Sequence, residues 1–456
     1  MGTLQSIYDK MPIFIQNIMT SLSGRQRNRD RYGRAYYQRR EFLAEFDKKT
    51  LAEKLEYQRN KTAEFVRQAA EKSVFYKKFY KNINLDEIKT LDDLKKLPSV
   101  DKETLRANIN DVYTVPKTGS VESHTGGTTG KSLTVRGMRE DMMFRMATLD
   151  HFKSRVGFEN RRMKRATFNG KHIVPPGQKA PVFWRYNRPC RQMIYSSFHI
   201  TEKNLPFYVK SLNAFKPAAI DGFFTSMCDV AGYIERHGLK LEFKPIAIFP
   251  TSETVTLQGR ELLEKVFGCK VYDQYASSEG APFITECPCG RLHTEMSTGV
   301  FEHFIKDSEE VLVTCFLTRG TPLIRYKIGD RVRFSETGAR CECGREDIYA
   351  EEIQGRRLDY LYTADGAKIN SVNIANMFKY IPNAIIRSQV IQEKTDEITI
   401  LLQIDGRLYK NEYDGMLADE FRHKFGKGTK INIRHVDEIP REKSGKLRLV
   451  VNRMDV

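Results

Sequence analysis

The feature that most constrains the fold is an alternation of strand-like and helix-like segments between residues 192 and 280. The strand-like segments are QMIYSSFHI (192–200), PAAIDGFF (217–224), KPIAIFPTSE (244–253) and KVYDQYASSEG (270–280), and the helix-like segments between them are ITEKNLPFYVKSLNAF (200–215), MCDVAGYIERHGL (227–239) and RELLEKVFGCK (260–270). This alternation predicts an α/β fold with a parallel sheet and helices on its faces. Ligands bind at the carboxyl ends of such strands, where TSE (251–253) and YASSE (275–279) are expected.

The rest of the chain indicates further parts, because 456 residues are too many for one ordinary core. Residues 1–110 are predicted to be mainly helical, and short β segments follow from about residue 300. We predict a large N-terminal domain, 1–354, with helix-flanked sheets and a β-rich subdomain. A hinge at 355–359 would join it to a small, mobile α+β lid at 360–456.

A Gly-rich loop, SHTGGTTGKS at residues 123–132, has the composition of a phosphate-binding loop. It is not a Walker A loop, because that pattern needs a glycine where this chain has Thr125. The loop offers hydroxyls, approachable backbone N–H groups and one mobile positive charge, from Thr125, Gly126, Gly127, Thr128, Thr129, Gly130 and Lys131. A flexible surface loop without a ligand is the alternative interpretation.

Four of the eight cysteines occur in two copies of the pattern Cys-x-Cys-Gly, CPCG at 287–290 and CECG at 341–344. The repeat resembles two halves of a tetrahedral thiolate site, for which zinc is the expected metal. The candidate ligands are Cys287, Cys289, Cys341 and Cys343, with His293 as a fifth candidate. Two exposed turns are the alternative. The other cysteines are scattered, so we expect no disulfide framework.

The N-terminal region is basic. The chain has 75 Lys+Arg against 58 Asp+Glu, a net charge of +17, and many of the arginines lie in residues 24–40. Such a run could meet nucleic acid, an anionic membrane or an acidic polymer. We favour a solvated helix face and no nucleic-acid partner, because no nucleic-acid motif accompanies the run. The apolar stretch MPIFIQNIMTSL (11–22) could rest on a membrane surface, but we favour a helix packed into the core.

Composition places the chain among globular proteins, with 40% hydrophobic and 11% aromatic residues. No apolar run has the length of a membrane span, and the N-terminus lacks the pattern of a secretion signal. A cytoplasmic protein, monomeric or homodimeric, is therefore expected.

Five motifs occur in an order that resembles a known group of enzymes. They are SHTGGTTGKS (123–132), YASSE (275–279), YKIGD (326–330), GRRLD (355–359) and PREKSGKLR (440–448). Each is similar to a motif of the adenylate-forming superfamily, which contains the acyl-CoA synthetases and the firefly luciferase-like proteins. Within it, the chain resembles the phenylacetate-CoA ligase-like branch, close to capsule-biosynthesis and coenzyme adenylating synthetase-like members. It departs from the usual motifs at Ala276, Ser278, Ile328 and Leu358.

The resemblance implies ATP and Mg²⁺ as cofactors and assigns a role to each motif. Loop 125–131 would hold the β- and γ-phosphates, with Lys131 supplying charge. In YASSE, Glu279 would be a ligand of the magnesium ion, Ser278 would contact the α-phosphate, and Tyr275 would stack on the adenine. Asp330 would bind the ribose, with Arg356 beside it. Lys446 would bring positive charge to the α-phosphate and the attacking carboxylate.

The resemblance also bears on the metal site. This branch often carries a cysteine before a Gly-Leu-His and a later Cys-x-Cys-Gly-Arg, which would make His293 a ligand in place of Cys289. We favour four cysteines, because a soft metal site gains from a fourth thiolate, and keep His293 as the alternative ligand. Either set would clamp the segment 287–343 as a structural zinc site.

The predicted function is ATP-dependent activation of a carboxylic acid as an acyl-adenylate, followed by transfer to a thiol such as coenzyme A. A CoA-independent ligase or adenylyl transferase that acts on a sugar, an amine or a coenzyme, in capsule or polysaccharide biosynthesis, is the alternative. A binding protein without activity is the third reading. The acid pocket is expected near residues 198–200, 223–226, 251 and 275.

Overall fold

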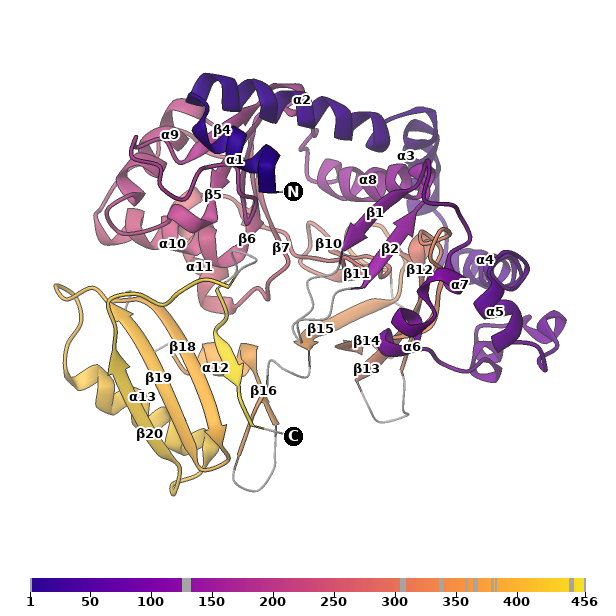
Figure 1. Cartoon of the computed structure of the whole chain (residues 1–456). Helices are drawn as coiled ribbons and strands as arrows, with labels where there is room; N and C mark the ends of the chain where they lie inside the picture. The colour runs from indigo at the N-terminus through magenta and orange to yellow at the C-terminus, as the bar shows by residue number, and fades with distance from the viewer. Residues whose placement is uncertain are drawn as a thin grey trace. The chain divides into compact units, whose positions relative to one another are not determined.

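The sheet that the alternation predicts is present in the computed structural model of the chain (Figure 1). The structure describes residues 2–124, 133–303, 309–335, 340–356, 360–363, 368–378, 381, 384–442 and 447–454. The chain divides into two compact units. Unit 1 comprises Met1–Gly24, Asn160–Val271 and Gln354–Val456, and unit 2 comprises Arg25–Glu159 and Tyr272–Ile353.

Unit 1 contains a six-stranded sheet with the order β4-β5-β3-β6-β7-β8. Its strands are β3 (Arg165–Asn169), β4 (Trp184–Asn187), β5 (Gln192–Ser196), β6 (Ala219–Phe223), β7 (Ala247–Thr251) and β8 (Lys270–Val271). All neighbouring pairs are parallel except β4 with β5, so β4 is an antiparallel edge strand. The connecting helices are α9 (Leu205–Phe215), α10 (Phe224–Arg236) and α11 (Leu257–Phe267). The predicted strand–helix order is therefore confirmed.

The C-terminal part of unit 1 has its own four-stranded sheet, ordered β20-β19-β18-β21. Its elements are β16 (Tyr360–Tyr362), β17 (Lys368–Asn370), α12 (Ser371–Asn376), β18 (Ile385–Lys394), β19 (Glu397–Ile404), α13 (Glu412–Phe425), β20 (Lys430–His435) and β21 (Val450–Asn452). Ile398, Ile400 and Leu402 alternate along β19 and are buried together with Leu417 and Phe421 of α13. This period of two places one face of the sheet against the helix.

Two helices begin the chain, α1 (Gly2–Lys10) and α2 (Ile13–Arg31), and α2 lies beside the edge strand β4 (Figure 1). Among the residues that the structure describes, we find no helix with both the length and the apolar character needed to cross a bilayer.

Unit 2 combines helices with a seven-stranded sheet ordered β12-β13-β14-β15-β11-β10-β9. The helices are α3 (Arg34–Asp47), α4 (Leu51–Lys72), α5 (Val74–Phe79), α6 (Lys102–Ala107), α7 (Ile109–Val112) and α8 (Arg139–Ser154). The sheet strands are β9 (Gln274–Tyr275), β10 (Ile284–Glu286), β11 (Leu292–Thr294), β12 (Gly299–His303), β13 (Glu310–Cys315), β14 (Leu323–Phe334) and β15 (Tyr349–Arg356). A separate hairpin pairs β1 (Val121–His124) with β2 (Thr134–Gly137).

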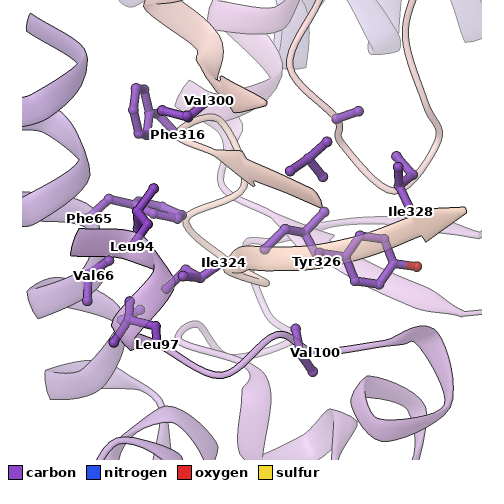
Figure 2. Packing of buried hydrophobic residues seen from close by; sticks show 14 of the residues in the cluster. Phe65, Val66, Leu94, Leu97, Val100, Val300, Phe316, Ile324, Tyr326 and Ile328 are labelled. Atoms are coloured by element: carbon purple, nitrogen blue, oxygen red, sulfur yellow. The ribbon is translucent and has the colours of Figure 1, made fainter. Parts of the chain in front are cut away.

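The core of unit 2 forms around β14. Figure 2 shows Ile324, Tyr326 and Ile328 of this strand in one cluster with Leu94 and other side chains from α4 and from the segment before α6. That segment also pairs with the strand, because Val100 donates to the carbonyl of Arg325 at 3.1 Å and accepts from the N–H of Lys327 at 2.8 Å. The segment is thereby held as an addition to the sheet.

Both compact units contain parts of residues 1–354, and the C-terminal region has its own sheet. One expectation needs adjustment. YASSE (275–279) does not follow a parallel strand, because β8 stops at Val271 and Tyr275 belongs to β9, which pairs antiparallel with β10. TSE (251–253) does begin at the end of the parallel strand β7.

We expect Leu94→Ala to destabilise unit 2 by about 2–5 kcal/mol, because it leaves a cavity in a fully buried cluster. Urea denaturation followed by hydrogen exchange of unit 2 peptides measures this change. Leu257→Ala is the matched control, since 58% of Leu257 is exposed and its loss should change stability by less than about 0.5 kcal/mol. Equal effects of the two substitutions would contradict this account of the core.

Candidate active site and metal centre

The YASSE loop is held in one shape by its own side chains and by α8. The hydroxyl of Ser277 accepts hydrogen bonds from the N–H groups of Gly280 at 3.1 Å and Ala281 at 2.9 Å. Arg145 of α8 donates to the carbonyl of Ser277 at 3.1 Å. Gly280 has a φ of +114°, and a Cβ there would lie 2.3 Å from Cγ2 of Thr318. Another residue would therefore not fit at this position.

This shape exposes Ser278 and buries Glu279. The carboxylate of Glu279 lies 3.7 Å from Nζ of Lys102, the first residue of α6. Asp101 caps that helix by accepting from the N–H of Thr104 at 2.8 Å, and Val100 is paired with β14. Lys102 is a neighbour that the sequence motifs do not reveal, since the contact depends on a segment distant in sequence being added to the sheet.

Asp330 lies on β14 and is buried. The hydroxyl of Tyr275 donates to its Oδ2 at 2.6 Å. The structure thus brings YASSE and YKIGD, two motifs distant in sequence, into direct contact. A buried carboxylate can accept further hydrogen bonds from the hydroxyls of a ligand.

Several predicted site residues lie outside the residues that the structure describes. They are Thr125, Gly126, Gly127, Thr128, Thr129, Gly130, Lys131 and Lys446, together with hinge residues 357–359. Arg356 is placed as the last residue of β15, but its side chain is not described. The strands on either side of the Gly-rich loop pair with each other, with His124 opposite Thr134.

The aromatic side chains expected at the acid pocket have different surroundings in unit 1. Phe223 and Phe224 are buried, and Phe224, the first residue of α10, belongs to a core cluster of unit 1. Phe198 stacks on His172 with ring centroids 4.5 Å apart. Phe224 is therefore part of the core, which leaves Phe198 as the better candidate for a pocket residue.

Four side chains that could ligate a metal ion gather in unit 2. They are Cys287, His293, Cys341 and Cys343, and their ligand atoms all lie within 4.8 Å of one another. The sulfurs of Cys287 and Cys341 are 3.8 Å apart, and the sulfur of Cys343 is 3.6 Å from Nε2 of His293. Three sulfurs and one imidazole are a donor set that suits zinc.

The two Cys-x-Cys-Gly turns have the same backbone geometry. The N–H of Cys287 donates to the carbonyl of Arg291, and the N–H of Cys341 donates to that of Arg345, both at 2.9 Å. The N–H of each turn's glycine donates back to the carbonyl of the first cysteine. The sequence repeat therefore corresponds to a structural repeat.

The side chains depart from this symmetry. Cys289 is exposed and does not belong to the group of four, whereas His293 on β11 does. The favoured set of four cysteines thus differs from the set that the geometry brings together, which is the alternative set with His293. The reason is the strand pairing, because β11 continues from the first turn and pairs His293 with Tyr349 of β15, next to the second turn.

His293 is oriented by a buried acid. Its Nδ1 lies 2.8 Å from Oδ2 of Asp347, whose other oxygen lies 2.9 Å from Nζ of Lys54. Burial lowers the pKa of His293, and the hydrogen bond with Asp347 opposes this change. A neutral imidazole that donates from Nδ1 presents the lone pair of Nε2 toward Cys343, as a metal ligand requires. The sequence offers no signal for the role of Lys54.

Comparisons with known proteins agree with this fold. A family model described as the CapK C-terminal domain matches residues 361–453. The chain is 37% identical over 452 residues to Protein CapK of Staphylococcus aureus, covering 98% of this chain and 99% of that protein. It is 23% identical over 204 residues to indoleacetate–lysine synthetase of Pseudomonas savastanoi, covering 43% of this chain and 48% of that protein.

A solved structure of 2-hydroxyisobutyryl-CoA ligase, in the postadenylation state, has a TM-score of 0.72 at 16% identity over 89% of this chain and 91% of that chain. Its similarity concerns the fold, whereas the alignment with Protein CapK, at 37% identity, covers nearly the whole of both chains. The chain therefore has the fold of the adenylate-forming superfamily and belongs to the CapK family.

Proposed function

We propose that this chain catalyses the ATP-dependent adenylation of a carboxylic acid with release of pyrophosphate. The observation that carries the proposal is the hydrogen bond from Tyr275 to Asp330, which unites two motifs of the superfamily. Glu279 follows Tyr275 in the same loop, and its neighbour Lys102 lies two residues after Val100, which pairs with the strand that bears Asp330. The fold of the superfamily and membership of the CapK family support this reading.

The proposed reaction converts a carboxylate into a better acyl donor. A carboxylate itself is a poor acyl donor because its leaving group would be an oxide ion. An oxygen of the acid attacks the α-phosphorus of ATP, the bond to the bridging oxygen breaks, and pyrophosphate takes the electron pair. The resulting acyl-adenylate has AMP as its leaving group. The main barrier is electrostatic, because an anion approaches a polyanion.

The described residues divide this work. Asp330 would accept hydrogen bonds from the ribose hydroxyls, and Tyr275 would hold that carboxylate in place while its ring faces the adenine. Glu279 would hold Mg²⁺, which supplies positive charge to the phosphate oxygens. Lys131, the loop 125–130, Ser278, Arg356 and Lys446 keep the roles that the resemblance implies, as part of the same proposal.

The second step would transfer the acyl group from AMP to a nucleophile. A thiol such as coenzyme A is our first proposal, in line with the CoA ligase of the same fold. An amine or sugar acceptor is the second, supported by the sequence similarity to an enzyme named indoleacetate–lysine synthetase. Adding CoA, or amines, to a preformed acyl-adenylate distinguishes the two by the product that forms.

We also propose that Cys287, His293, Cys341 and Cys343 hold one structural zinc ion. Their spacing, the buried imidazole and the acid behind it support this set. The donors come from the β10–β11 turn and from the turn before β15, so the metal would fix two distant segments of one sheet.

Substituting Glu279 tests the proposed chemistry. Glu279→Gln should lower acid-dependent, Mg²⁺-dependent ATP–pyrophosphate exchange on the order of a hundredfold, because the proposed metal ligand loses its charge. Glu103→Gln is the control, since Glu103 is an exposed carboxylate in α6 beside Lys102, and exchange should not change. No exchange by the unaltered chain across a broad panel of acids, together with no ATP binding in calorimetry, would overturn the proposed function.

Substituting Tyr275 tests the nucleotide site. Tyr275→Phe should raise the KM for ATP about tenfold with a much smaller change in kcat, because Asp330 loses a charge-assisted hydrogen bond while the aromatic ring remains. Tyr409→Phe is a matched control, as Tyr409 donates to Asp414 at the same distance of 2.6 Å in the C-terminal sheet region. If both variants raise the KM equally, Tyr275 has no special part in ATP binding.

Elemental analysis tests the metal site. The protein purified without added metal should contain one zinc per chain. Cys343→Ser and His293→Ala should release the zinc and lower the melting temperature. Cys289→Ser should retain it, because Cys289 is the one of the five candidate ligands that lies outside the group. Loss of zinc from Cys289→Ser with retention in His293→Ala would instead favour four cysteines. A zinc content near zero, with cysteine thiols that react freely, would show that these residues do not form a zinc site.

A further inference from the structure

Helix α2 packs against the protein with its polar face. Gln16, Thr20 and Gly24 lie on one side of the helix and are buried. Nε of Arg185, on β4, donates to Oε1 of Gln16 at 2.6 Å, and the guanidinium is completely buried. A surface helix normally turns its apolar face inward, so this helix is inverted.

The edge strand explains the inversion. As the edge of its sheet, β4 has backbone groups that no neighbouring strand can satisfy. The N–H of Tyr186 donates to Oδ1 of Asn17 at 2.8 Å, and its carbonyl accepts from Oγ of Ser21 at 3.2 Å. A Cβ at Gly24 would lie 2.1 Å from Oδ1 of Asn187, so the helix sits close to the strand. Polar side chains must face inward to make these bonds.

The apolar face consequently points outward. Phe14, Ile18 and Leu22 are 64%, 53% and 60% exposed. Their spacing of four residues places them in an arc of roughly 80° on the helix surface. Segment 11–22 was expected to pack its apolar side into the core. For the face with Phe14, Ile18 and Leu22 that expectation is wrong, because the polar side of the helix forms hydrogen bonds with the edge strand β4.

Basic residues continue the same face. Arg25 and Arg29 follow Leu22 at helical spacing and are exposed. Exposed Lys10 ends the preceding helix, on which Ile7 is also exposed. The outer face of α2 is therefore a row of three apolar side chains that leads into positive charge.

We propose that this face, formed by Phe14, Ile18, Leu22, Arg25 and Arg29, docks on an anionic phospholipid surface. A helix of this kind lies in the plane of the interface, with its apolar side chains at the boundary of the acyl region. The guanidinium groups bind phosphate oxygens of the headgroups, and the negative surface potential attracts the chain's net charge of +17.

The chemistry of the face favours a membrane over other occupants. Nucleic acid would account for the arginines but not for the exposed apolar row. A second copy of the chain would bring the same positive charge to the contact. One row of three side chains is also much smaller than the roughly 800 Å² per partner of a stable protein interface.

Co-sedimentation with vesicles tests the proposal on the full chain, without any need for enzymatic activity. Vesicles of phosphatidylcholine with about one third phosphatidylglycerol should bind the protein, and binding should fall as salt rises. Phe14→Gln/Ile18→Gln/Leu22→Gln should weaken binding at least about tenfold. Arg25→Gln/Arg29→Gln should weaken it about fivefold for each arginine, and vesicles of phosphatidylcholine alone should bind poorly.

Leu257→Gln is the control for the apolar variant, because Leu257 is equally exposed on α11 and should not affect binding. Circular dichroism melting confirms that the altered chains fold. The proposal is overturned if the unaltered chain does not bind anionic vesicles. It is also overturned if the Phe14→Gln/Ile18→Gln/Leu22→Gln variant binds them as strongly as the unaltered chain. A dimer that sedimentation velocity detects without lipid and that the triple variant loses would make a second copy the occupant, which also overturns the proposal.

Discussion

Strand β14 carries the interactions on which unit 2 depends. Alternate residues of this strand, Ile324, Tyr326 and Ile328, enter the core, and its backbone also pairs with the segment around Val100. The same alternation continues to Asp330, which therefore meets Tyr275. A shift of one residue would turn the core side chains to the opposite face and move the carboxylate away from its partner. Core packing and site geometry are thus two results of one register.

The arrangement of the four candidate metal ligands depends on a second constraint, which is the balance of charges in a buried region. Around these ligands lie three carboxylates and three cationic side chains, namely Asp47, Glu295, Asp347, Lys54, Arg155 and Arg345. Buried ions are costly unless each finds a partner. Because Asp347 also bonds His293, the orientation of one candidate ligand depends on a network that extends to α3, α4 and α8.

The sequence was informative where the signal is local. The strand–helix alternation predicted a parallel sheet and four of its six strands, β5 to β8, and the Cys-x-Cys-Gly repeat predicted two turns that prove to share their backbone geometry. The sequence was insufficient where a contact with a segment distant in the chain determines the local arrangement. The choice between Cys289 and His293 depends on the pairing of β11 with β15. The inward face of α2 depends on an edge strand more than 150 residues away, which no helical pattern records. Lys102 reaches Glu279 only because a distant segment joins β14.

The strand order of unit 2 has a consequence for the life of the nascent chain. In space β15 lies between β14 and β11, yet it is the last of the seven strands to be synthesised. Until residue 356 has left the ribosome, β11 and the part of β14 beyond its pairing with the segment around Val100 each present an open edge, and such edges are templates for wrong pairing. The sheet can be completed only after most of the chain has been synthesised. A chain that ends before β15 would therefore keep two unpaired strand edges, at which other chains can pair, on a sheet that lacks only this strand.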